Sequence, residues 1–151
     1  MRTTELLEVL KDQRNNLNQF HEIVLMKQRA LVMNDIKGIE GAIVREEKMI
    51  NKVENCEKQR VQLLSSLKEK LNLDYPSNRM TDFILKAGEL VDAKLKREFE
   101  RELEIIEKLV SVIQEINEQN QFLITNARNF IRKIIEAVAQ GGKQSILDRK
   151  I

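Results

Sequence analysis

Apolar residues recur at alternating steps of three and four positions through the C-terminal half of the chain. The ladder reads Leu95, Phe99, Glu102, Ile106, Leu109, Ile113, Ile116, Asn120, Leu123, Ala127, Phe130, Ile134 and Ala137, with only two polar members. This is the a/d spacing of a heptad repeat, and no Gly or Pro interrupts it. It predicts one long helix over residues 89–139. Residues 95–138 alone would span about 65 Å, so the helix must lie along other helices or along a partner.

Two further ladders precede it. Leu10, Leu17, Val24 and Leu31 recur every seven residues and predict a helix over residues 4–32. The Asn34-Asp35 pair is a turn signal, and a new ladder over residues 35–71 follows at once. That ladder reads Ile36, Ile39, Ile43, Glu46, Ile50, Val53, Glu57, Arg60, Leu64, Leu67 and Leu71. So short a connection predicts an αα-hairpin, with the polar members Glu46, Glu57 and Arg60 fixing its register.

The remaining segments are short. The only Pro lies in residues 72–78, which predicts a break, and Thr81-Asp82 can start a short helix over residues 81–87. The Gly pair at 141–142 ends the long helix and leaves residues 140–151 as a flexible C-terminal tail. The predicted fold is all-α: an elongated antiparallel three-helix bundle or coiled coil, with a long C-terminal helix. Residues 1–139 form one domain.

Composition and charge narrow the function. One third of the residues are charged, 4% are aromatic, and 26 basic residues offset 24 acidic ones to leave a net charge of +2. This is typical of long helices, and it shows no basic surplus for nucleic acid. No apolar run approaches membrane-spanning length, so we expect a cytoplasmic protein without stable membrane insertion. His21 and Cys56 lack converging ligands or a catalytic partner, so we expect no metal, no cofactor and no enzymatic activity.

The apolar pattern is densest where the long helix should outrun its neighbours. If the long helix packs along the helix over residues 35–71 from residue 88 onward, it passes the end of that helix at about residues 123–127. The apolar side chains after this point cover more of the helix circumference than one seam needs. Soluble monomers avoid exposing such an apolar patch. The predicted partner-binding residues are Ala127, Phe130, Ile131, Ile134, Ile135 and Val138, continued by Ile146 and Leu147 in the tail. The partner is another protein or a second copy of the chain. The alternative is a bend at Asn126 or Asn129 that folds the segment back.

Residues 25–36 read Leu-Met-Lys-Gln-Arg-Ala-Leu-Val-Met-Asn-Asp-Ile, a Lys-Gln-x-Ala-Leu segment followed by an Asn/Asp turn. This segment and two others resemble the FlgN family of bacterial flagellar export chaperones. Residues 57–64, Glu-Lys-Gln-Arg-Val-Gln-Leu-Leu, resemble the charged segment that ends in Leu-Leu. Residues 116–124, Ile-Asn-Glu-Gln-Asn-Gln-Phe-Leu-Ile, resemble the Asn-x-x-Asn stretch. The similarity in length and helix order covers most of residues 4–138.

The resemblance implies a helical chaperone without enzymatic activity. Such a protein binds hook-associated proteins of the hook–filament junction through its C-terminal helix and tail, prevents early assembly, and delivers them to the export gate and ATPase of the type III apparatus. Family members often carry a Tyr near the tail, whereas the only Tyr here is Tyr75, so no aromatic gate contact carries over. Three alternatives stay open: a structural coiled-coil or oligomerising subunit of a larger complex, a helical enzyme or metal protein, and a nucleic-acid-associated coiled coil.

Overall fold

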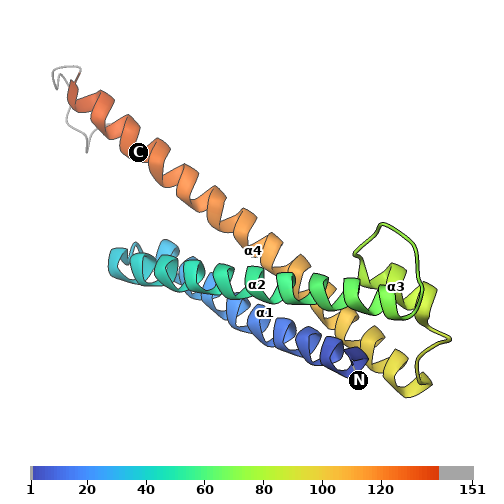
Figure 1. The fold of residues 1–151 in the computed structure, drawn as a ribbon. Coiled ribbons are helices and arrows are strands. Elements are labelled where there is room, and N and C mark those ends of the chain that lie inside the picture. Colours follow the sequence, from blue (N-terminus) through green and yellow to red (C-terminus); the bar gives the residue numbers. More distant parts are fainter. Residues whose placement is uncertain (1, 140–151) are drawn as a thin grey trace.

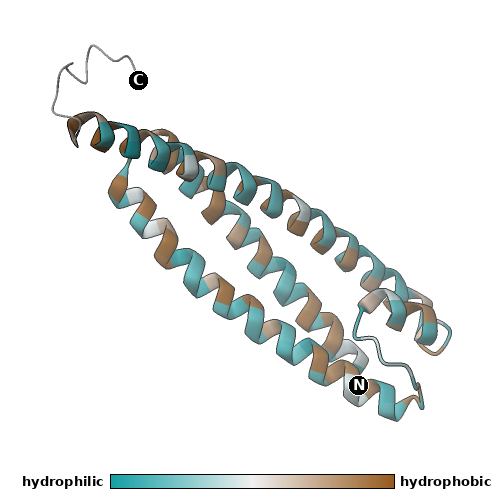
Figure 2. Ribbon diagram, turned by 90° about the horizontal axis from the view of Figure 1, so that it is seen from above, coloured by the Kyte–Doolittle hydropathy of each residue, from teal (hydrophilic) through white to brown (hydrophobic). Residues whose placement is uncertain are grey.

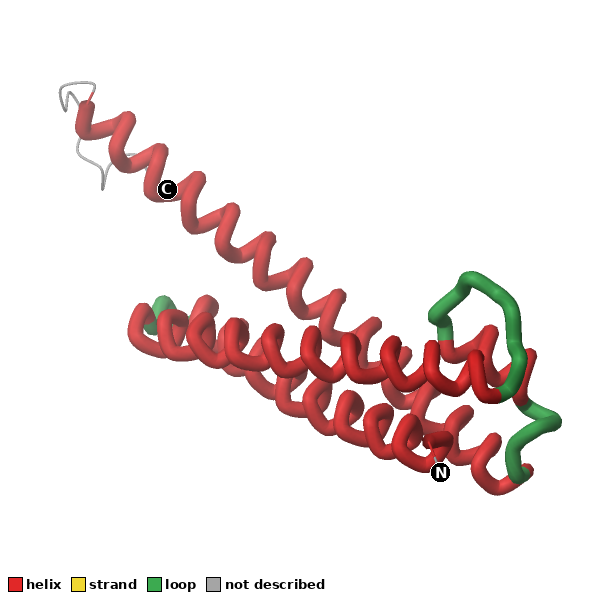
Figure 3. Tube along the Cα trace, in the orientation of Figure 1, coloured by secondary structure: helices red, strands yellow, loops and turns green. Residues whose placement is uncertain are grey.

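The computed structural model describes residues 2–139, and these residues form helices joined by loops, with no strand among them. The helices are α1 (Arg2–Val32), α2 (Ile36–Lys70), α3 (Met80–Ala87) and α4 (Ala93–Ala139) (Figure 1). The loop drawings in Figure 3 show a tight turn between α1 and α2 and a much longer connection between α2 and α3. The predicted all-α bundle is confirmed. The division into one domain and a tail stays a prediction, and residues 140–151 lie outside the described part of the chain.

The α1–α2 turn is built by two residues with special roles. Asn34 takes a left-handed backbone conformation with φ 53°, which Asn tolerates better than most residues. Asp35 then caps α2, since its Oδ1 accepts a hydrogen bond from the Gly38 amide at 3.1 Å. A Cβ on Gly38 would lie 2.5 Å from Oδ2 of Asp35, so glycine leaves room for the cap. The sequence therefore fixes both the sharp reversal and the first turn of α2.

Replacing Asp35 with Ala should lower the free energy of unfolding by about 1 kcal/mol, because the Gly38 amide loses its acceptor. Urea denaturation followed by circular dichroism measures the change. Asp74→Ala is the matched control, since Asp74 is an exposed loop residue with no interaction of this kind. Equal midpoints for the two variants would contradict the role of the cap.

The main hydrophobic core lies at the end of the bundle that holds the N-terminus. Phe83 of α3 and Phe99 of α4 are 1% exposed and meet edge to face, with ring centroids 6.3 Å apart. All four helices contribute to this core cluster, which consists of Leu6, Leu7, Leu10, Leu64, Leu67, Met80, Phe83, Ala87 and Phe99. The short helix α3 is therefore part of the core and not merely a connection.

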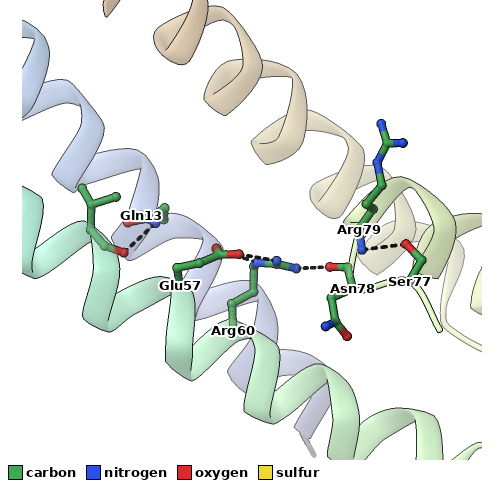
Figure 4. Close-up of polar contacts among 7 residues, drawn as sticks. Gln13, Glu57, Arg60, Ser77, Asn78 and Arg79 are labelled. Carbon is green, nitrogen blue, oxygen red and sulfur yellow. Dashed lines mark hydrogen bonds and ion pairs between the residues drawn. The ribbon is translucent and has the colours of Figure 1, made fainter.

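Side chains of α2 hold the loop that leads to α3. Arg60 binds Glu57 on its own helix and donates from Nη1 to the Asn78 carbonyl oxygen at 2.7 Å (Figure 4). Lys68 donates from Nζ to the carbonyl oxygens of Tyr75 and Ser77. These contacts hold the loop after α2 against the bundle, and α3 begins directly after that loop.

The partner of α4 is α1, which lies between the other two long helices. Arg14 pairs with Glu102 at 3.0 Å, and Asn120 donates to the Val24 carbonyl oxygen at 3.1 Å. No Cα atom of α2 lies within 8 Å of one in α4. The sequence-based assumption that the long helix packs along residues 35–71 was therefore wrong. Near the core, side chains of α3 lie in the cluster with those of α2 and α4.

This arrangement also corrects part of the predicted α2 seam, since four of its eleven members are exposed. Up to Cys56, α2 packs on α1 and buries one narrow stripe that includes Ala42, Met49 and Cys56, whereas Leu64 and Leu67 near its C-terminal end lie in the core cluster. The predicted members Ile36, Ile43, Ile50 and Glu57 are exposed instead. Glu46 does lie in the interface, where it pairs with Lys27 at 3.2 Å. The apolar ladder of residues 35–71 is wide enough to pack against two helices, and along most of its length only α1 packs against it.

Candidate partner-binding surface

The C-terminal part of α4 extends beyond its support. Asn120, opposite Val24, is the last buried residue of α4 before the overhang, and within the overhang Ala137 is also buried. From the Val24–Asn120 contact α1 continues 8 residues to Val32, about 12 Å, whereas α4 continues 19 residues to Ala139, about 28 Å. Figure 1 shows α4 also separating from the α1–α2 hairpin along this stretch. The helix is unbroken through Asn126 and Asn129, so the fold-back alternative is not what the structure shows.

The predicted binding residues of α4 lie on one side of this free segment. We call this surface the distal face; it consists of Ala127, Phe130, Ile131, Ile134, Ile135 and Val138. At about 100° per residue their positions fall within an arc of about 140°, wider than a single heptad seam. Phe130, Ile131, Ile135 and Val138 are between 45% and 61% exposed, and Ile134 is half-buried. Figure 2 shows hydrophobic residues recurring through this end of α4. Ile146 and Leu147 lie outside the described residues.

The charges beside the distal face are mainly basic. Residues 127–139 carry Arg128, Arg132 and Lys133 against the single acid Glu136, a net charge of +2. Arg132 donates to the Asn129 side chain at 3.0 Å, and no ion pair within the described residues involves any of the three cations. An apolar stripe with cations at its edges favours an amphipathic helix with acidic flanks.

A second exposed apolar surface lies at the tip of the α1–α2 hairpin, and sequence reasoning missed it. Val32, Met33, Ile36 and Val44 are each more than half exposed. A signal was available: residues 31–36 stay apolar on both sides of Asn34-Asp35, whereas most turns between helices are polar. This hairpin surface is divided between two helices and the turn that joins them, so it lacks the sustained helical spacing of the distal face.

Polar groups interrupt the seam between α1 and α4. Glu102 is 4% exposed, and its Oε2 atom has no hydrogen-bond partner, although Oε1 accepts from Arg14. Asn120 is 1% exposed, and its Oδ1 atom is likewise unpaired. Buried polar groups of this kind fix register more than they add stability. The two polar positions of the long ladder therefore set where α4 sits on α1.

The residues considered for chemistry have structural surroundings. Cys56 is buried, and its thiol donates to the Val9 carbonyl oxygen at 3.4 Å. Burial raises the pKa of this thiol above its usual 9.0, and the nearby carboxylates Asp12 and Glu57 raise the pKa further. His21 is half-buried on α1, and the described residues contain no group of His, Cys, Asp and Glu that could hold a metal ion.

Alkylation of Cys56 by iodoacetamide at pH 8 should be at least tenfold slower in the folded protein than in urea. The reason is that only the thiolate reacts, and the raised pKa and the burial both reduce its availability. Mass spectrometry of timed samples gives both rates. Equal rates would show that the thiol is open and contradict the packing described for α2.

Taken together, these features define a helical protein in which one helix end extends beyond its neighbours and carries exposed apolar side chains. The chain belongs to the FlgN family, because the family profile described as FlgN protein matches residues 1–147. The FlgN family is a family of flagellar export chaperones. No curated protein and no solved structure gives a significant match to the chain. None of the helices that the structure describes is long and apolar enough to cross a membrane.

Proposed function

We propose that this chaperone works in the cytoplasm and binds hook-associated proteins of the flagellar hook–filament junction through the distal face of α4. It keeps these proteins from assembling early and delivers them to the gate or ATPase of the type III export apparatus. The observation that carries the proposal is the unpaired α4 segment. This segment carries large exposed apolar side chains at helical spacing and extends beyond the end of α1.

The energetics support binding of a client helix. Covering four or five large apolar side chains is worth about 6–12 kcal/mol before the costs of ordering and of association. Those costs reduce the net affinity to a range that allows release at the export apparatus. Proteins that polymerise through amphipathic helices would offer the matching surface, and a chaperone that covers it blocks the polymer contact.

Light scattering tests the blocking step. A purified hook-associated protein from the same cell is brought to conditions in which it self-associates, with or without an equimolar amount of the full chain. We expect the chain to suppress the rise in scattering. Unchanged self-association, together with a tight homo-oligomer of the chain alone, would favour the second candidate function, a structural coiled-coil subunit that buries its distal face against copies of itself.

A further inference from the structure

A groove between α3 and α4 lies well away from the distal face. It has a volume of about 360 Å³ and is lined by Ile84 and Leu85 of α3 and by Glu100, Leu103, Glu104 and Glu107 of α4. Ile84 and Leu103 are partly buried and pack on the core cluster, so they form a firm apolar floor. Leu85 is 81% exposed, the highest value for any large apolar side chain among the described residues. We call this feature the acidic groove.

The three glutamates make the lining of the groove negatively charged. They are spaced four and then three residues apart, which places them along one side of α4. Glu104 pairs with Lys108 at 3.1 Å, and both side chains of that pair are at least two-thirds exposed. Glu100 and Glu107 make no ion pair with any described residue. The residues that line the groove therefore combine an apolar floor with three carboxylates and no cation, and only Glu104 is ion-paired among the described residues.

From this combination we propose that the acidic groove binds a basic amphipathic helix of a second protein, distinct from the client on the distal face. One apolar side chain of that helix covers Ile84, Leu85 and Leu103. Lysines or arginines three and four residues to either side pair with the glutamates. The volume lies at the small end of binding pockets, which suits one or two side chains.

Residues 140–151 cannot reach the acidic groove of the same molecule. Ala139 lies 32 residues beyond Glu107 on α4, which is about 48 Å along the helix axis. The 12 residues after Ala139 reach at most about 41 Å when fully extended.

The acidic groove and the distal face also differ in charge and position. The groove has three acids along its side, and residues 127–139 carry a net charge of +2. Glu107 and Phe130 are 23 residues apart on one unbroken helix, a separation of about 35 Å. Both surfaces can therefore be occupied at once, and the opposite charges direct different helices to each.

Nuclear magnetic resonance on the full chain tests the proposal with two synthetic peptides. One is a short helical peptide with a central leucine pair and lysines three and four residues to either side, and the other has glutamate in place of every lysine. We expect the lysine peptide to shift amide resonances of residues 81–86 and 100–107, and to bind at least tenfold more weakly in 0.5 M salt. A lysine peptide that shifts only other residues, or a glutamate peptide that binds the groove equally well, would overturn the proposal.

Variants distinguish binding of the lysine peptide in the acidic groove from nonspecific binding elsewhere on the chain. Leu85→Ser and the double change Glu100→Gln with Glu107→Gln should each weaken the lysine peptide at least tenfold. Leu90→Ser and the double change Glu115→Gln with Glu118→Gln are matched controls, because these residues are exposed and lie outside the groove. Wild-type affinity in the groove variants would refute the site. Because no flagellar client is used, this outcome is independent of whether the distal face binds hook-associated proteins.

Discussion

Replacing Phe99 with Ala is expected to lower the free energy of unfolding by about 3–5 kcal/mol, the range for deleting a buried aromatic side chain. Phe99 is 1% exposed and meets Phe83 edge to face, so the change removes the contact that joins α3 to α4 as well as the buried ring itself. A loss of this size is a large share of the stability of a typical small domain.

Urea denaturation of the full chain measures the effect of Phe99→Ala. Phe122→Ala on the same helix is the control, because that ring is 66% exposed and its loss should change the free energy of unfolding by less than about 1 kcal/mol. If the two variants were equally stable, the core cluster would not be the main source of stability, and α3 would have to be regarded as a peripheral segment.

The second large effect is expected on client binding. Changing Phe130 and Ile135 together to Ser should remove about 2–4 kcal/mol of binding free energy, or roughly 30- to 900-fold in Kd. Both side chains belong to the distal face and are exposed, so the melting temperature should stay within a few degrees of the wild type. Calorimetric titration with a hook-associated protein gives the affinity.

Val110→Ser with Val112→Ser is the matched control for this variant. These two valines are also exposed apolar residues of α4, at 38% and 39%, but they precede the free segment. The control should bind the client like the wild type. Equal weakening in both double variants would point to a general effect on α4 and would contradict a specific role for the distal face.

The sequence predicted the helices well because their signals are local. The Asn34-Asp35 turn, the Pro in residues 72–78 and the uninterrupted ladder from Leu95 onward each depend on residues close together in the chain. The ladder also identified Glu102 and Asn120 as polar positions of a seam, and both are buried in the structure. Local periodicity determines which face of a helix is apolar.

Periodicity does not determine which helix covers that face. The ladders of residues 35–71 and 95–138 could pair with each other or with residues 4–32, and the choice depends on packing among all four helices. In the structure both α2 and α4 pack against α1. Ile36, Ile43 and Ile50 are therefore exposed where a seam was expected. The role of Phe83 was missed for the same reason, since eight residues of α3 carry too short a pattern to reveal a core position.

The distal face was predicted from an overhang of the long helix beyond the helix it packs on. The packing partner assumed in that prediction was wrong, but the overhang is present in the structure. The sequence suggested an overhang beyond α2, whereas the overhang is beyond α1. Either hairpin helix ends at the same turn, so a long helix that starts at the opposite end outruns both. That these residues bind a client remains a proposal, and the acidic groove could not be foreseen because it needs the placement of α3 on α4.

The most direct test of the central claim is a calorimetric titration of the full chain with a hook-associated protein from the same cell, repeated at several temperatures. The account predicts one-to-one binding with a negative heat-capacity change, because apolar surface is buried when the client covers the distal face. The Phe130→Ser, Ile135→Ser variant should show a smaller change in heat capacity. Absence of binding by the wild-type chain, with light scattering showing a stable homo-oligomer, would contradict the account.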